Sequence, residues 1–399
     1  MRDLSAELEF LFRCLHHAVQ DQGSSVDRQS PPALTPPPAL DWPAFLALAQ
    51  LHGILAAVYP LIAPYAPEDF AAAVGSEWVS SLMLCVEFES VLDAFASGGI
   101  DVMPLKGPAL AEDLYGDVTA RRSVDLDLLV RSRDYARAEA LLLQSGFNSV
   151  PSPTYEYHWT FQRDGTTIEL HTLLGVPEDC PFDIDGVWSR SVAATFRGRP
   201  MRSLQEEDLI LYLCYHCLKH EYIRLLWIGD LGRALLRAQR LAKADSLLEK
   251  ARIQGMEMLI LCGCATVAET ISTALPAELT AALAQQPSIA RAVNAFLEMQ
   301  FGNSPQPARF PQLWSETAKI ETGPSGFWRS LRRLLPTKND RSWGQSHHIP
   351  GPLLVVLLPV IRPIRILHTF GFTCAWEAFL FGFRRKAGAK AIPLHDRPV

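Results

Sequence analysis

The sequence places two carboxylates one residue apart at the start of an apolar run. Asp125 and Asp127 alternate with apolar residues in 124–130, a pattern typical of a β-strand that enters a core. Successive strand residues point to opposite faces, so the two carboxylates point the same way and raise each other's pKa. A divalent cation between them would offset this repulsion. The alternative, on these residues alone, is a pair of solvated acids at a strand edge.

A third carboxylate follows on a predicted hairpin. Residues 158–162 and 166–170 read as two strands around an Arg-Asp-Gly turn, and Glu169 and His171 share one face of the second strand. We expect this strand to lie antiparallel beside the Asp125 strand. Three acids in one place could hold two magnesium ions, which suits phosphoryl or nucleotidyl transfer, and one acid could help deprotonate an attacking hydroxyl. The alternative is a solvent-facing Glu169.

Upstream, a turn suited to phosphate precedes a short predicted helix. Lys106 and Gly107 lie between a strand candidate at 100–105 and a helix at 109–115. Backbone N–H groups and the helix dipole at such an N-terminus favour an anion, and Lys106 adds a cation. A plain strand–helix turn with a surface lysine is the alternative.

Downstream, basic side chains are spaced for one helix face. Counted from His216, residues Lys219, His220 and Arg224 lie three, four and eight positions on. They predict a basic wall that faces a triphosphate or an acceptor, with a purely structural role as the alternative. His216 and His220 also have the spacing of a metal pair, but no acidic third ligand with recognisable spacing accompanies them.

Composition limits the class of protein. The 399 residues are 48% hydrophobic and 20% charged, which is ordinary for a globular chain with a core, and the net charge of −6 argues against an extended nucleic-acid footprint. The eight cysteines lack the spacing of a zinc site or a disulfide framework, so we expect buried reduced thiols. The N-terminus is acidic where a signal peptide would be cationic, which predicts a cytoplasmic protein.

Changes of composition along the chain predict four regions. Residues 366–383 and the proline-containing run at 349–361 are apolar but short or interrupted for a transmembrane helix. We expect them to form a C-terminal helical cover, and a peripheral membrane contact is the less favoured alternative. The regions are an N-terminal helical part at 1–75 with a proline-rich linker at 22–40, a core at 76–200, a helical domain at 201–300, and an irregular segment with C-terminal apolar helices at 301–399.

These motifs together resemble a known family, the uncharacterised nucleotidyltransferases of the DNA polymerase β-like superfamily. The likeness spans most of 40–370 and is sharpest over 100–171. The superfamily's usual Gly-Ser or Gly-Gly turn is Lys106-Gly107 here, farther from the acidic pair. The stretches that carry the likeness are LKGPALA at 105–111, LYGD at 114–117, RRSVDLDLLV at 121–130, GF at 146–147, IELH at 168–171, KHEYIRLLWIGD at 219–230, LLPT at 334–337 with Asp340, and RP at 362–363.

The resemblance implies an α+β fold, in which a small mixed β-sheet core with helices on one face is embedded in a largely α-helical protein. It implies a site with two Mg²⁺ ions and an NTP, for which we expect ATP. Asp125, Asp127 and Glu169 are the predicted catalytic and metal-binding residues. The predicted nucleotide-binding residues are Lys106, Gly107, Arg121, Arg122, Lys219, His220 and Arg224.

The predicted function is magnesium-dependent transfer of a nucleoside monophosphate to an acceptor. Because the family is known largely from biosynthetic gene clusters, the acceptor stays open between a metabolite, a peptide and a protein. Two alternatives remain. The first is a non-catalytic nucleotide sensor or scaffold that keeps the fold, and the second is a phosphotransferase that moves the γ-phosphate with the same metal site.

Overall fold

The structure is a computed structural model of the chain, and it describes residues 4–20, 33–150, 157–175, 182–220, 222–241 and 243–301. The chain divides into two compact units, 1–306 and 307–399, so all described residues belong to the first unit. The predicted C-terminal apolar segments lie outside the described residues, as does most of the predicted proline-rich linker. In the described part of the chain, every helix is too short or too polar to cross a membrane.

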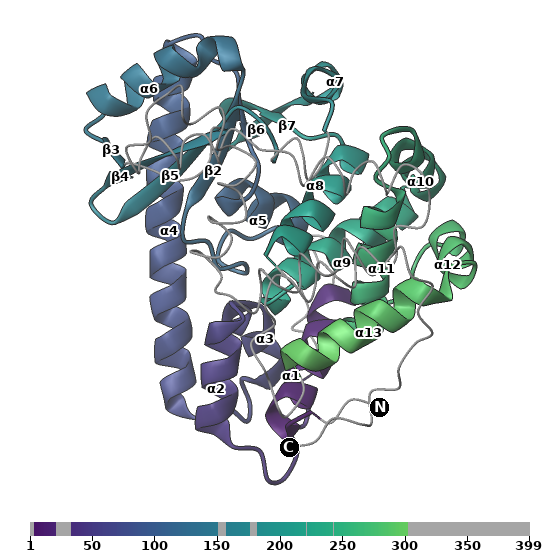
Figure 1. The fold of residues 1–399 in the computed structure, drawn as a ribbon. Helices are drawn as coiled ribbons and strands as arrows, with labels where there is room; N and C mark the ends of the chain where they lie inside the picture. Colours follow the sequence, from purple (N-terminus) through teal and green to yellow (C-terminus); the bar gives the residue numbers. More distant parts are fainter. Residues whose placement is uncertain are drawn as a thin grey trace, which may run out of the picture. The chain divides into compact units, whose positions relative to one another are not determined.

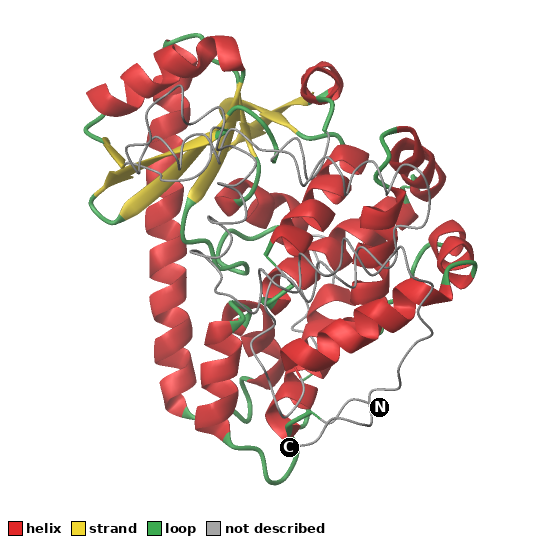
Figure 2. Ribbon diagram, viewed as in Figure 1, coloured by secondary structure: helices red, strands yellow, loops and turns green. Residues whose placement is uncertain are grey.

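A small mixed sheet lies at one end of this unit (Figures 1 and 2). Strand β2 is flanked by β1, which is antiparallel to it, and by β5, which is parallel to it. Strand β4 then pairs antiparallel with β5, and β3 pairs antiparallel with β4. In spatial order the strands are β1 (Val102–Pro104), β2 (Leu126–Val130), β5 (Thr166–His171), β4 (His158–Arg163) and β3 (Asn148–Val150).

The parallel pairing of β2 with β5 corrects the antiparallel pairing that we expected. The hairpin was predicted rightly, because β4 and β5 are joined by a tight turn and run antiparallel. Strand β4, the first strand of the hairpin, lies on the side of β5 that is remote from β2. Strand β5, the second strand, pairs with β2 and runs parallel to it. Parallel neighbours need a long crossover, which residues 131–165 supply through a 3₁₀ turn, η1 (Ser132–Asp134), the helix α6 (Tyr135–Gln144), and strands β3 and β4.

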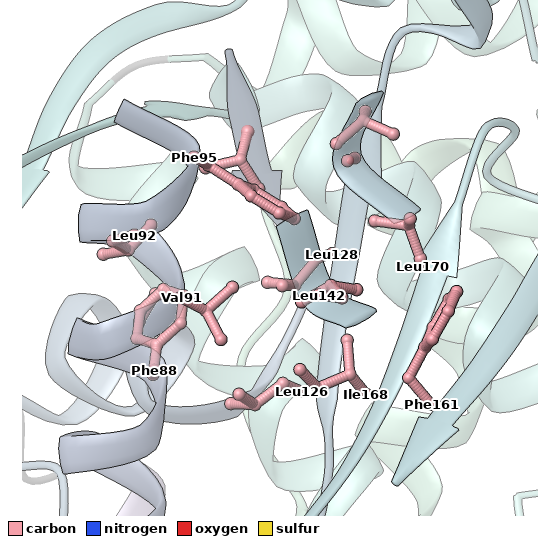
Figure 3. Packing of buried hydrophobic residues seen from close by; sticks show 14 of the residues in the cluster. Phe88, Val91, Leu92, Phe95, Leu126, Leu128, Leu142, Phe161, Ile168 and Leu170 are labelled. Atoms are coloured by element: carbon pink, nitrogen blue, oxygen red, sulfur yellow. The ribbon is translucent and has the colours of Figure 1, made fainter. Parts of the chain in front are cut away.

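Two helices bury one face of the sheet (Figure 3). The long helix α4 (Glu68–Ser97) presents phenylalanines and aliphatic residues at helical spacing, and α6 adds Leu142. The strands contribute apolar side chains to this core from alternate positions, so their polar side chains lie on the other face of the sheet. The residues labelled in Figure 3 are Phe88, Val91, Leu92, Phe95, Leu126, Leu128, Leu142, Phe161, Ile168 and Leu170.

Most of the remaining described chain is helical (Figure 2), which confirms the predicted α+β fold. Three helices precede α4: α1 (Ala6–Gln20), α2 (Trp42–Leu51) and α3 (Leu55–Ile62). Helix α5 (Gly107–Tyr115) joins β1 to β2, and a second hairpin follows the sheet. This later part comprises α7 (Ile184–Arg190), β6 (Val192–Phe196), β7 (Arg199–Ser203), α8 (Glu206–Lys219), α9 (Leu225–Arg240), α10 (Ala244–Ile253), α11 (Glu257–Ile271), α12 (Ala277–Ala284) and α13 (Pro287–Phe301).

The cysteines of the described chain are free and buried, as expected. They are Cys14, Cys85, Cys214, Cys217, Cys262 and Cys264. The division of the chain into four regions, with boundaries near residues 75, 200 and 300, stays a prediction.

Candidate functional site

The register of β2 and β5 brings the predicted acids to one cleft. Asp127 lies opposite Glu169, and Leu129 lies opposite His171. Asp125 stands one residue before β2, on the same side of the backbone as Asp127. All three predicted acids and His171 line a cavity of about 460 Å³. The sequence therefore located the acids correctly on a common face, although it gave the wrong strand direction.

The Lys106-Gly107 turn forms the N-terminus of α5 beside these acids. Gly107 has φ +75°, and a Cβ built on it would lie 3.4 Å from the backbone oxygen of Asp125. This left-handed conformation favours glycine, because other residues adopt it only with strain. The ammonium of Lys106 lies 2.9 Å from a carboxylate oxygen of Asp127. Lys106 thus pairs with an acid of the site, and phosphate binding by this turn stays a prediction.

His171 joins the acids and was not among the predicted site residues. Its Nε2 lies 3.3 Å from Asp127 Oδ1 and 3.4 Å from Glu169 Oε2. Burial alone would lower the pKa of His171, but its hydrogen bonds with the two carboxylates raise it. The signal was present in the sequence, since alternate positions of one strand place His171 on the face of Glu169.

The electrostatics of the acids differ from one to the next. Burial first, and then the charge of Asp127, raise the pKa of Asp125 to about 6. Burial would also raise the pKa of Asp127, but Lys106 and His171 hold it well below its usual value. The hydrogen bond from His171 lowers the pKa of Glu169. Carboxylates whose pKa values are driven apart in one cleft are common at functional sites.

The side chains of Asp127, Glu169 and His171 fit a metal ion. Each offers one ligand atom, and these atoms lie within 4.8 Å of one another. Within the described part of the chain no other group of three such residues meets this condition. A donor set of two carboxylates and an imidazole suits Mn²⁺ better than Mg²⁺, because Mg²⁺ prefers oxygen ligands. Asp125 lies outside this closest group and lines the cleft beside it.

Arg121 is engaged by an acid that the sequence did not identify. Its guanidinium is almost fully buried and makes a two-pronged contact with Asp230 of α9, with N···O distances of 2.8 to 3.0 Å. The hydroxyl of Tyr115 donates to the same carboxylate at 2.8 Å. A phosphate contact by Arg121 would have to compete with this buried pairing. Its neighbour Arg122 donates to the carbonyl of Gln50 at 3.3 Å and lines the cleft.

The opposite wall comes from the corner between α8 and α9. Lys219 is the last residue of α8, His220 caps its C-terminus, and Arg224 precedes α9. All three line the cleft. The expected single helix face is wrong, because α8 ends at Lys219 and Tyr222 takes a left-handed conformation with φ 51°. A helix corner, rather than helical spacing, brings Arg224 to the wall.

This wall is more aromatic and less basic than predicted. The ring centres of His216, His220 and Trp227 lie 4.7 to 5.0 Å from one another. Burial lowers the pKa of His220 to about 4 and that of His216 well below its usual value, so both imidazoles are neutral at neutral pH. The sequence missed Trp227 as a wall residue, since nothing local fixes the direction of a helix corner.

The family described as "Uncharacterised nucleotidyltransferase" matches residues 38–272. The chain belongs to this uncharacterised nucleotidyltransferase family. The resemblance seen in the motifs is confirmed, and the protein is a transferase enzyme. No curated protein matches the chain.

Two solved structures are similar to part of this nucleotidyltransferase. One is a solution structure of the antibiotic-resistance factor ANT(2″)-Ia, with 16% identity and a TM-score of 0.32, covering 43% of this chain and 92% of that one. The other is a crystal structure of ANT(2″)-Ia in complex with adenylyl-2″-tobramycin, with 16% identity and a TM-score of 0.33, covering 43% of this chain and 97% of that one.

Proposed function

We propose that the chain is a metal-dependent enzyme that transfers a nucleoside monophosphate from an NTP, with ATP as the expected donor, to an acceptor that carries a hydroxyl. The observation that carries the proposal is the register that sets Asp127 opposite Glu169, beside Asp125 and the N-terminus of α5. Family membership supports nucleotidyl transfer as the reaction class.

The phosphates are expected at the N-terminus of α5. Because Gly107 has no side chain, a phosphate can approach the backbone N–H groups there. Lys106 can exchange its contact with Asp127 for one with a phosphate oxygen. Lys219, across the cleft at the end of α8, supplies a second cation. In-line attack from the side of Glu169 would require the β- and γ-phosphates to lie on the opposite side of the α-phosphorus.

Asp125, Asp127 and Glu169 are the proposed metal-binding residues, with His171 as an additional ligand or as a positioning group. Mg²⁺ is the expected ion, and two such ions would supply charge neutralisation at the phosphate oxygens. Asp125 and Asp127 repel each other, so they need such a counterion once Lys106 turns to the phosphate.

Glu169 is better placed than Asp127 to meet the acceptor. Its side chain is 30% exposed, whereas that of Asp127 is 3% exposed. The acceptor oxygen would bond to the α-phosphorus, pyrophosphate would leave with the bridging oxygen, and the hydroxyl proton would pass to Glu169. The acceptor remains a metabolite, a peptide or a protein, and the cytoplasm is the compartment in which we expect it.

Labelled ATP tests the reaction class. The full chain is incubated with Mg²⁺ or Mn²⁺ and fractions of candidate acceptors, with the label in the α- or the γ-phosphate. Transfer of the α-label with release of pyrophosphate supports the proposal. Transfer of the γ-label would establish a phosphotransferase instead, and metal-dependent ATP binding with transfer of neither label would favour a sensor.

Two variants tie the activity to the acids. Asp127→Asn keeps the shape of the side chain but removes a charge, so we expect loss of metal-dependent transfer. The control is Asp101→Asn, which removes the same charge from an exposed residue outside the cleft. Equal activity of the two variants would contradict the assignment.

A further inference from the structure

The ring cluster at the α8–α9 corner has no role in phosphate or metal binding as proposed above. His216, His220 and Trp227 line the same cleft as the acids. The ring of Trp227 lies 5.0 Å from each histidine ring, and Trp227 is half-buried at the first turn of α9. The cluster therefore belongs to the wall of the cleft opposite β2 and β5. A ligand would meet aromatic rings on this wall and carboxylates on the other.

The chemistry of this wall suits a flat, uncharged group. Both imidazoles are neutral at neutral pH, because burial lowers the pKa of His220 to about 4 and holds the pKa of His216 well below its usual value. Neutral aromatic rings bind phosphate poorly but stack well on a nucleobase. The wall thus complements the end of a nucleotide that the acids and the α5 turn do not hold.

Two further observations point to a ligand at the cluster. The guanidinium of Arg224 lies 5.7 Å from the centre of the Trp227 ring, and within the described part of the chain it has no carboxylate at ion-pair distance. His216 is only 5% exposed, yet its Nε2 has no hydrogen-bond partner among the described residues. A buried polar atom without a partner costs free energy, which a bound base or its water could recover.

We propose that the base of the NTP stacks on Trp227, between the α8–α9 corner and the acid-bearing strands, with Arg224 bordering the same ring. This inference rests on the proposed function, since it names the subsite for the donor nucleotide. It also divides the predicted nucleotide-binding residues by role. Lys106, Gly107 and Lys219 face the phosphate chain, whereas His220 and Arg224 border the base.

The test compares a nucleotide with the same molecule lacking its base. Isothermal titration calorimetry with Mg²⁺ measures the dissociation constants of a non-hydrolysable ATP analogue and of ribose 5-triphosphate for the full chain. In the wild type, the ATP analogue is expected to bind about tenfold tighter, which is the usual contribution of one stacked base. Trp227→Ala is expected to abolish this difference by weakening only the ATP analogue, and Trp227→Phe to preserve most of it.

The matched control is Trp78→Ala, because Trp78 is 40% exposed on α4 and lies outside the cleft. It should leave both constants unchanged. If Trp227→Ala does not fold, Trp227→Leu keeps an apolar side chain without the aromatic face, and the same results are expected of it.

Equal binding of the two ligands by the wild type would overturn the subsite, and so would equal weakening of both ligands by the loss of Trp227. Failure of the proposed function gives a different result, in which neither ligand shows metal-dependent binding to the wild type.

Discussion

Replacing Asp230 by alanine would leave the guanidinium of Arg121 buried without its carboxylate. Asp230 and Arg121 are 1% and 4% exposed, and the pair makes contacts of 2.8 to 3.0 Å. Burial opposes the charge of Arg121, yet contact with Asp230 raises its pKa, so the charged form depends on this partner. Removing one member of such a buried pair costs about 3 kcal/mol or more in the free energy of unfolding. The hydroxyl of Tyr115 loses its acceptor as well.

The assay is urea unfolding followed by circular dichroism, with Asp93→Ala as the control. Asp93 forms a comparable ion pair with Arg199 at 2.9 Å, but its side chain is 60% exposed, so its loss should cost less than about 1 kcal/mol. The double variant Arg121→Met/Asp230→Leu replaces the pair by apolar groups and should recover most of the lost stability.

The reasoning is refuted if Asp230→Ala is no more destabilising than Asp93→Ala, or if the double variant is as unstable as the single one. Because Arg121 lies four residues before Asp125, we also expect Asp230→Ala to weaken metal-dependent ATP binding. A change of stability without a change in binding would limit the pair to a structural role.

Three further predictions concern the cleft itself. The pKa of Asp125 is raised to about 6, so a proton competes with the metal ion for this carboxylate below that pH. Metal-dependent ATP binding should therefore weaken as the pH falls from 7 to 5. The pH profile of Asp125→Asn should be flatter near pH 6. His171→Gln should weaken Mn²⁺ binding more than Mg²⁺ binding in metal titrations, because an imidazole ligand favours Mn²⁺, and equal effects would exclude direct ligation. Gly107→Ala places a side chain at φ +75° beside Asp125, so it should destabilise the fold by about 1 kcal/mol and weaken ATP binding measured by calorimetry, whereas Gly165→Ala, at φ +84° but with open space around it, should cost stability without affecting binding.

Local pattern was enough to predict which residues share a face. The alternation in 124–130 and 166–171 set Asp125, Asp127 and Glu169 on the polar side of two strands, and the sheet buries their apolar neighbours as expected. The direction of β5 relative to β2 could not be predicted in this way. The neighbour of β2 was predicted rightly, but the direction of that neighbour depends on how the chain crosses over between β2 and β5, and no local pattern fixes this path.

Partners distant in the sequence account for the other differences. The carboxylate that holds Arg121 is 109 residues away in the chain, so no local signal connects them. Arg224 reaches the cleft through a left-handed residue at Tyr222, which an uninterrupted helical count does not anticipate. The same corner turns Trp227 toward the acids, and a sequence pattern that favours a helix says nothing about where such a corner points.

The most direct test of the site is a titration of the full chain with Mn²⁺, followed by electron paramagnetic resonance in the presence of the non-hydrolysable ATP analogue. The proposed two-metal site predicts about two tightly bound ions per chain. Asp127→Asn should lose this binding, and Asp101→Asn should retain it. Tight Mn²⁺ binding that is the same in the wild type and in Asp127→Asn would contradict the assignment of the acids on β2 and β5.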